Sequence, residues 1–342
     1  GQGFGGKLLR ALIEKSERTG TPLYLETETE SNVRMYEHLG FTVVRDRPAH
    51  HQLAHVGNDA RRMKMNETFE MITVNAENLD KQGFFCYMSK RKSPGYQQKR
   101  AWMAARLAEG LKLHMIHEIG GRTVGFIEYI PGEVAWRAVH APGYLLIHCL
   151  WVVGKGKGKG YGAHLIQTCL DDARAQDKHG VVTVATERVW MAKKDIFLKH
   201  GFVDVAQAPP LFHLLVYRFD DSGASAAAAP LPAFPTDWEA RQARFGAGLT
   251  VIRTPQCPYV EDATNIALEF AAENGIPARV ATFQSAQELQ ANAPSPYGVF
   301  GIVLDGKLLA YHYLQRKDFD AYATRIDPHT TCGELLVLSF LC

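Results

Sequence analysis

Apolar and polar positions alternate along this chain in blocks that predict short strands and amphipathic helices. The clearest block runs from Tyr144 to Gly162: an apolar run of ten residues gives way to glycines at every second position with lysines between them, and then to an amphipathic segment. Ten apolar residues are too few to span a membrane, so the block predicts a buried strand, a glycine loop and a helix. Because glycines let a ligand approach the backbone and a helix N-terminus offers unpaired N–H groups, this junction is suited to a phosphorylated ligand.

The same order of elements occurs twice. Residues 1–6 (GQGFGG) lead into a helical pattern, which is followed by a strand, a short helix and the pair Gly40-Phe41. Shifts of 157 and 161 residues bring these features onto Gly160 to Gly162 and onto Gly201-Phe202. A repeat of about 160 residues is too long for a solenoid, whose repeats have roughly 20–50 residues. We therefore expect a duplicated domain, whose first copy, residues 1–65, contains only the half from the glycine loop onward.

The second copy, residues 69–219, has the elements of a complete mixed α/β domain. The pair Gly120-Gly121 marks a hairpin between two of its strands. The predicted strands are 69–74, 113–118, 123–130, 144–153, 181–185, 203–205 and 212–217, and the predicted helices are 97–110, the segment after Gly162 and a short helix that stops at Gly201.

A linker rich in alanine and proline, residues 220–240, separates this domain from a third one at 241–322. The third domain has a β-α-β-α-β-β pattern with strands at 249–253, 278–283, 299–303 and 307–311 and helices at 259–274 and 286–291. This order resembles a thioredoxin-like fold. Residues 323–342 form a tail to which the pattern assigns no structure.

Composition excludes several classes of function. The chain has 342 residues and a net charge of +2, which predicts two or three domains and gives no sign of nucleic acid or a membrane as a partner. Its six cysteines show no CxxC pair and no metal-ligand spacing. We therefore expect no metal site and a reducing, cytoplasmic location. The composition does not indicate the oligomeric state.

The spacing of the glycines tests other interpretations of the loop. All glycines from 154 to 162 lie an even number of positions apart, whereas the Walker A and GxGxxG patterns each need an odd separation. A nucleic-acid patch built from Lys155, Lys157 and Lys159 lacks accompanying aromatic residues. A flexible hinge is the remaining alternative, and the strand and helix on either side favour a fixed loop instead.

Residues 69–219 resemble the GNAT superfamily of acetyl-CoA-dependent N-acetyltransferases. The motif [Gln/Arg]-x-x-Gly-x-[Gly/Ala] stands here as residues 157–162, KGKGYG, with lysine leading. The segments 126–131 (FIEYIP), 141–152 (APGYLLIHCLWV) and 197–202 (FLKHGF) are similar to YoaP-type acetyltransferases. Such proteins also carry a thioredoxin-like C-terminal module. The first copy resembles the C-terminal half of another GNAT domain.

This resemblance implies acetyl-CoA as cosubstrate and an amine of a small molecule or peptide as acceptor. The strand end before the loop would bind the pantetheine arm and polarise the thioester carbonyl, and the loop with the helix N-terminus would bind the pyrophosphate. The implied cofactor-binding residues are Trp151, Val152, Val153, Lys157, Gly158, Lys159, Gly160, Tyr161, Gly162 and Ala163.

Three residues are candidates for proton transfer. Glu128 lies among apolar residues, where burial would raise its pKa, and His148 lies in the central strand; either could be a general base. A paired carboxylate and a hydrogen-bonded core histidine are the structural alternatives. Many GNAT enzymes protonate the leaving thiolate with a tyrosine four residues before the Gly-Phe pair. The first copy has this residue as Tyr36 but the second has Phe197, so Tyr161 or water would have to serve.

Cys257 lies in Thr254 to Val260, at the position of the thioredoxin redox motif, where the helix N-terminus would favour a thiolate. Val260 replaces the second cysteine, which argues against a disulfide reductase. A redox thiol and a packed remnant both stay open, and Pro296 is a candidate cis-proline. The sequence thus predicts an N-acetyltransferase. The alternatives are a CoA-binding or partner-binding module without turnover and a thiol-based redox-linked protein.

Overall fold

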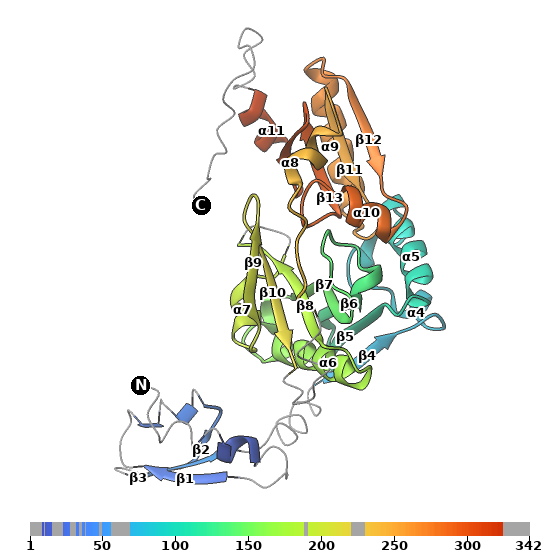
Figure 1. Cartoon of the computed structure of the whole chain (residues 1–342). Helices are drawn as coiled ribbons and strands as arrows, with labels where there is room; N and C mark the ends of the chain where they lie inside the picture. Colours follow the sequence, from blue (N-terminus) through green and yellow to red (C-terminus); the bar gives the residue numbers. More distant parts are fainter. Residues whose placement is uncertain are drawn as a thin grey trace. The chain divides into compact units, whose positions relative to one another are not determined.

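The computed structural model describes residues 9, 11–15, 23–27, 32–33, 36–37, 39–47, 50–55, 69–187, 191–219 and 230–323 (Figure 1). The predicted loop at 1–6, most of the linker and nearly all of the tail lie outside these residues. The chain divides into two compact units, residues 1–70 with 117–122 and the remainder. In the described parts, no helix is both long enough and apolar enough to cross a membrane.

The first unit contains a three-stranded antiparallel sheet with the order β1-β3-β2. Its strands are β1 (Leu23–Thr27), β2 (Thr42–Arg47) and β3 (His50–His55). Strand β1 lies where the strand before the short helix was predicted, and β2 directly follows the pair Gly40-Phe41. Strand β3 was not predicted, because its three histidines break the apolar pattern.

The second unit holds a mixed seven-stranded sheet with the order β4-β5-β6-β7-β8-β10-β9 (Figure 1). Strand β7 pairs antiparallel with β6 and parallel with β8, and β10 pairs antiparallel with both β8 and β9. The predicted mixed α/β class is confirmed. The strands are β4 (Phe69–Val74), β5 (Lys112–Glu118), β6 (Thr123–Pro131), β7 (Tyr144–Val152), β8 (Gly180–Ala185), β9 (Val203–Ala208) and β10 (Phe212–Arg218).

Four helices and three 3-10 turns accompany this sheet. Helix α6 packs on β6, β7 and β8 through an apolar face that includes Leu165, Ile166 and Cys169. Helix α5 begins with Ser93, whose side chain accepts a hydrogen bond from the N–H of Tyr96, a standard N-cap. The helices are α4 (Leu79–Gln82), α5 (Pro94–Leu107), α6 (Tyr161–Ala175) and α7 (Lys194–Leu198), and the turns are η1 (Met88–Lys90), η2 (Gly132–Val134) and η3 (Gly154–Gly156).

The C-terminal part forms a four-stranded sheet with the order β12-β11-β13-β14. Its β-α-β-α-β-β order agrees with the predicted pattern, and Asp305 and Gly306 take positive φ angles of 48° and 73° in the β13–β14 turn. Helix α8 precedes the sheet where a linker was expected. The elements are α8 (Trp238–Ala243), β11 (Leu249–Arg253), α9 (Val260–Glu273), β12 (Ala278–Thr282), α10 (Ala286–Asn292), β13 (Phe300–Leu304), β14 (Lys307–Ala310) and α11 (Arg316–Ala323).

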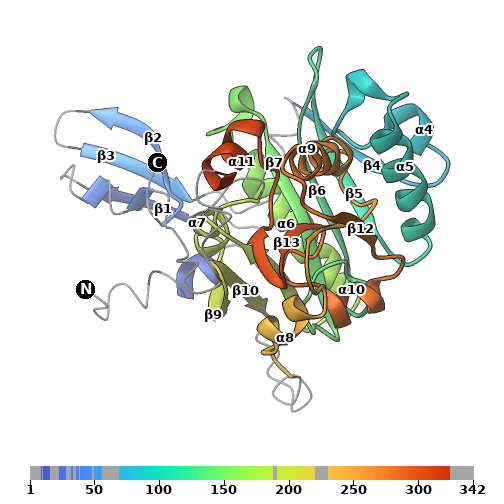
Figure 2. The ribbon, with the colours of Figure 1, turned by 90° about the horizontal axis from the view of Figure 1, so that it is seen from above.

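These two sheets share one hydrophobic core. Trp102 and Trp136 belong to the same buried cluster as Phe283 and Leu289 of the C-terminal part. Figure 2 shows α9 beside α5, and the two helices are in contact. The prediction that Pro296 is a cis-proline is wrong: among the described residues the cis peptide bond precedes Pro210, in the β9–β10 turn. The Pro296 carbonyl instead accepts a hydrogen bond from Ala138 N–H at 3.2 Å, which joins the two parts.

Candidate active site

Strands β7 and β8 separate part of the way along their length. Their parallel pairing runs from Tyr144 opposite Gly180 to Ile147 opposite Thr183 and ends there, although β7 continues to Val152. A small cavity lies at the fork. Its lining residues are Ile147, His148, Cys149, Leu150, Thr183, Val184, Met191, Ala192 and Phe197. We call this the cleft; it is where the resemblance placed the thioester.

A β-bulge at His148 lies next to the point where the strands part. In the β6–β7 ladder Glu128 stands opposite Cys149 and Tyr129 opposite Ile147, so His148 is the extra residue of β7. Its carbonyl, released from the ladder, accepts a hydrogen bond from Nη2 of Arg137. Its ring nitrogen Nε2 accepts the N–H of Trp136 at 2.9 Å. The bulge is therefore held from both its backbone and its side chain.

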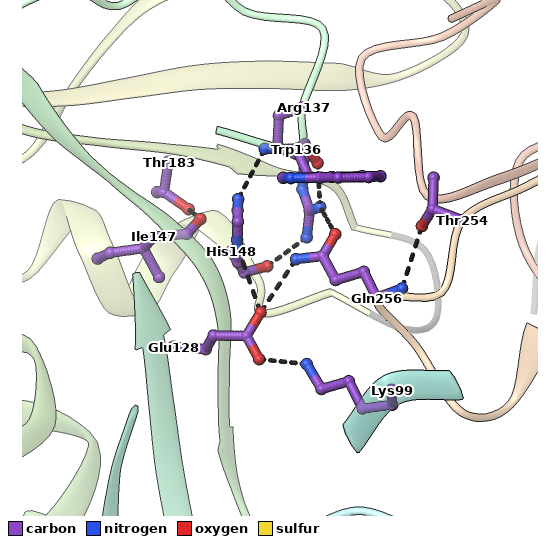
Figure 3. A network of polar contacts seen from close by, with 9 residues as sticks. All are labelled: Lys99, Glu128, Trp136, Arg137, Ile147, His148, Thr183, Thr254 and Gln256. Carbon is purple, nitrogen blue, oxygen red and sulfur yellow. Dashed lines mark hydrogen bonds and ion pairs between the residues drawn. The ribbon is translucent and has the colours of Figure 1, made fainter. Parts of the chain in front are cut away.

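Glu128 is the centre of a buried polar network around this bulge (Figure 3). Its Oε2 atom forms an ion pair with Lys99 of α5. Its Oε1 atom accepts hydrogen bonds from His148 Nδ1 at 3.2 Å and from Gln256 Nε2 at 3.0 Å. The other end of the Gln256 amide accepts from Arg137 Nη1 at 2.7 Å. Gln256 lies just before α9 in the C-terminal part of the chain, so this network joins the seven-stranded sheet to that part.

The network determines the charge states of its acid and its imidazole. Burial opposes the charged form of Glu128, but Lys99 and the His148 hydrogen bond outweigh it and hold the Glu128 pKa well below its usual range. The expectation of a raised pKa is wrong, because Lys99, remote in sequence, is its partner. Burial lowers the pKa of His148 to about 4, so its ring is neutral at pH 7. Since Nε2 accepts from Trp136, the proton is on Nδ1.

Cys257 is not the activated thiol that its position before α9 suggested. Burial raises its pKa despite the hydrogen bond from the backbone of Tyr259. Burial also raises the pKa of Cys149 to about 12 and that of Cys86 well above its usual value, with the other cysteines adding to the effect. The described cysteines are free thiols. In this environment, they are protonated and weakly nucleophilic.

The glycine loop connects the end of β7 to α6. Gly158 and Gly160 take positive φ angles of 80° and 81°, and Gly160 is the N-cap residue of α6. A Cβ at Gly162 would come within 2.8 Å of the Ile196 side chain, so that glycine permits close packing against α7. The predicted strand, loop and helix are therefore present. Tyr161 is buried and, like Glu128, is not part of the cleft lining.

Phe197 lines the cleft at the position where the resemblance expects a tyrosine. In both copies the phenylalanine of the Gly-Phe pair closes the same turn onto the residue four positions before the glycine. Phe202 N–H donates to Phe197 C=O at 3.2 Å, and Phe41 N–H donates to Tyr36 C=O at 3.1 Å. The rings of each pair also contact each other. The structure thus supports the equivalence of Phe197 and Tyr36 that the shift of 161 residues indicated.

Sequence reasoning missed Lys99, Arg137 and Gln256. Lys99 lies in a helix with other basic residues, and nothing in its spacing distinguishes it from its exposed neighbours. Gln256 belongs to another domain. Of the three, Arg137 could have been noticed in the sequence, since a single charge within the otherwise apolar segment VAWRAV indicates a buried cation that needs partners.

A mixed sheet in which two parallel strands part, with a glycine loop and a helix N-terminus beside the fork, is an arrangement that can hold a phosphorylated cosubstrate. Residues 76–202 match the sequence model of the acetyltransferase (GNAT) family. The uncharacterized N-acetyltransferase YoaP of Bacillus subtilis is 27% identical over 252 residues, which cover 73% of this chain and 96% of that protein. These matches support a GNAT acetyltransferase domain in this chain, and the protein is an acetyl-CoA-dependent acyltransferase.

Two further similarities concern shorter segments or weaker likenesses. The L-methionine sulfoximine/L-methionine sulfone acetyltransferase of Pseudomonas aeruginosa is 28% identical over 111 residues, 32% of this chain and 62% of that protein. The structure of yncA from Salmonella typhimurium, a putative acetyltransferase with its cofactor acetyl-CoA, aligns with a TM-score of 0.35 and 18% identity, covering 46% of this chain and 96% of that one.

The buried His148 makes the stability of the fold depend on pH. Because its folded pKa of about 4 is below its ordinary value of 6.5, the unfolded chain binds more protons between these pH values, and the free energy of unfolding falls as pH is lowered across this window. This group contributes at most roughly 3 kcal/mol, at about 1.4 kcal/mol per pKa unit. Urea unfolding from pH 7 to pH 4 should show a shallower dependence in His148→Gln, whose amide can replace both hydrogen bonds. Equal slopes would contradict the neutral histidine.

Proposed function

We propose that the protein is an N-acetyltransferase in which a neutral amine of a small molecule or peptide attacks acetyl-CoA directly in the cleft between β7 and β8. The observation that carries this proposal is the end of the β7–β8 pairing at Ile147 and Thr183. Beyond this point β7 offers backbone donors that β8 does not use.

The direction of these donors follows from the β6–β7 ladder. Val153 N–H donates to the Val124 carbonyl at 2.8 Å and therefore points toward β6. Because successive N–H groups of a strand point to opposite sides, those of Leu150 and Val152 point toward the cleft. They are the groups that would bind the pantetheine arm and polarise the thioester carbonyl. This refines the predicted set: Val152 stays in it and Leu150 joins it, whereas the amides of Trp151 and Val153 point toward β6.

The pyrophosphate of acetyl-CoA would lie at the N-terminus of α6. The amides of Gly162 and Ala163 belong to the first helical turn and have no acceptor within the helix. The helix dipole adds partial positive charge at this end, and the exposed side chains of Lys157 and Lys159 add full charges. This arrangement supports the predicted cofactor-binding residues of the loop.

The proposed roles of Glu128 and His148 are to position the bulge. A general base needs a free lone pair, but both ring nitrogens of His148 are engaged and the Glu128 carboxylate holds Lys99, His148 and Gln256. We infer that the amine reaches the thioester already neutral, or loses its proton to water. Tyr161 remains a candidate acid. Phe197 has no hydroxyl to protonate the thiolate of CoA.

The remaining domains are proposed to be accessory. The order β1-β3-β2 repeats the order β8-β10-β9, which supports a partial second GNAT copy in the first unit. The C-terminal sheet supports a thioredoxin-like domain, and the buried Cys257 with Val260 in place of a second cysteine disfavours a redox function. Free thiols are consistent with a cytoplasmic location.

Release of CoA from acetyl-CoA across a panel of amines, amino acids and peptides tests the function directly. We expect amine-dependent release by the unaltered chain, and a loss of at least about tenfold in CoA affinity, roughly 1.4 kcal/mol, in Gly160→Glu, which places bulk and negative charge at the phosphate site. Gly120→Glu is the control, because Gly120 also has a positive φ but lies in the β5–β6 turn, where an added Cβ would meet nothing within 4 Å. Tight CoA binding without release would favour a non-catalytic module.

A tyrosine at position 197 should help CoA to leave, because its hydroxyl can protonate the CoA thiolate. Because Phe197 lines the cleft, Phe197→Tyr would bring a phenol to the position that Tyr36 occupies in the first copy. A positioned acid contributes about 100-fold or more in favourable cases, and we expect kcat to rise by about tenfold with little change in KM for acetyl-CoA. Phe202→Tyr is the matched control. An unchanged kcat would show that protonation of the thiolate does not limit the rate.

A further inference from the structure

The buried network of Figure 3 contains more positive than negative charge. Lys99 and Arg137 are both cationic and buried, with 5% and 3% of their surfaces exposed. Glu128 is the one carboxylate among the described groups that act electrostatically on Arg137, and it is already paired with Lys99. His148 is neutral. An unneutralised charge inside a protein is costly, so this excess calls for an explanation.

Arg137 is the cation without an anionic partner. Its Nη1 donates to the Trp136 carbonyl at 2.6 Å and to Gln256 Oε1 at 2.7 Å, and its Nη2 donates to the His148 carbonyl. All three acceptors are neutral. Its Nε is buried and has no hydrogen-bond partner among the described residues, and the Tyr297 ring lies 5.1 Å from its guanidinium carbon. The Nε–H donor is therefore unused among the described residues.

Two indole donors next to this network are also unused. The Nε1 atoms of Trp102 and Trp136 are buried without a hydrogen-bond partner in the described part of the chain. The two rings pack edge to face with centroids 5.6 Å apart, and Lys99 Nζ lies 4.7 Å from the Trp102 ring. Buried polar groups are nearly always paired, so unpaired donors around a cationic centre point to an anionic acceptor.

The protein's own acidic groups near Arg137 do not supply the missing charge. Burial raises the pKa of Cys149 to about 12, and it also raises the pKa values of Cys257 and Tyr297. These groups are therefore neutral at pH 7. Among the described residues, no ionised acid other than Glu128 acts on Arg137, which leaves a ligand as the source of the balancing charge.

Arg137 does not line the cleft itself, but it is hydrogen-bonded to a residue that does. It binds the carbonyl of His148, and both His148 and Cys149 line the cavity where β7 and β8 part. We propose that the acceptor amine carries a carboxylate, which Arg137 binds through Nε where the C-terminal domain meets the acetyltransferase domain. This inference rests on the proposed function, since it names the substrate class of the same site. The acceptor is thus an amino acid or a related amino carboxylate.

Matched pairs of acceptors test the proposal: glycine, L-leucine and L-phenylalanine, each compared with its carboxamide at equal concentrations of unprotonated amine. We expect kcat/KM for the acid to exceed that for the amide by about tenfold or more, as for a charge-assisted hydrogen bond. Equal values for the pairs would overturn the proposal. Sodium acetate, as a free anion, should inhibit competitively against the amino acids.

Gln256→Glu supplies the missing charge from within the chain. The new carboxylate accepts from Arg137 in place of the amide, at 2.7 Å, and also stands against Glu128. Activity on acids and amides should both fall, and the ratio of kcat/KM for acid to amide should fall to within about threefold of unity. Gln284→Glu, which makes the same change at an exposed position, is the control and should keep the preference for acids over amides. Arg137→Lys retains a positive charge and should keep part of that preference. An unchanged preference in Gln256→Glu would contradict the assignment of Arg137.

A binding measurement tests the carboxylate site independently of acetyl transfer. If no acceptor of any pair releases CoA, the transferase proposal fails, and the carboxylate site is then tested by thermal unfolding in the presence of CoA and L-leucine or its amide. The proposal predicts that L-leucine, and not its amide, raises the melting temperature of the unaltered chain but not that of Gln256→Glu. Equal shifts in both proteins, or none in either, would overturn it.

Discussion

The ionised carboxylate of Glu128 is the group on which the rest of the site depends. Once it is buried it must be paired, and removal of one partner from a buried pair typically costs about 3–5 kcal/mol. Its partners come from α5, from the bulge of β7 and from the C-terminal domain. One charge therefore fixes three segments that are far apart in the sequence. It also accepts the Nδ1 proton of His148 and so fixes the tautomer of that ring, while burial keeps the ring neutral. The ring and the carbonyl of His148 hold the bulge where β7 begins to part from β8.

The same network explains why the C-terminal domain packs against the acetyltransferase domain as part of one unit. Gln256 uses both ends of its amide to bridge Glu128 and Arg137, and the hydrophobic cluster around Trp136 continues to Leu289. In a tethered accessory domain, neither feature would be needed. The motif that resembles a redox site thus contributes a polar bridge in place of a reactive thiol, and Cys257 packs beside it as a protonated side chain.

The sequence predicted those features whose cause is local. Glycine spacing located the loop before α6, the Gly-Phe pairs revealed the repeat, and apolar runs marked nearly every strand of the second unit. It did not predict the pKa of Glu128, because the surrounding strand is apolar while the deciding cation, Lys99, approaches from another element. Helix α8 was missed because its six residues, WEARQA, contain too few apolar positions to show a helical repeat. The pairing of Arg137 with Gln256 could not be predicted, because it depends on how two domains pack.

The state of His148 is the most direct measure of this account. In a chain labelled with ¹⁵N at histidine, and with the resonance assigned by comparison with His148→Gln, the ring should be neutral at pH 7 with its proton on Nδ1. It should remain neutral to about pH 5, in keeping with a pKa of about 4. An imidazolium at pH 7, or a neutral ring with its proton on Nε2, would contradict the network on which the bulge, the cleft and the contact between the domains depend.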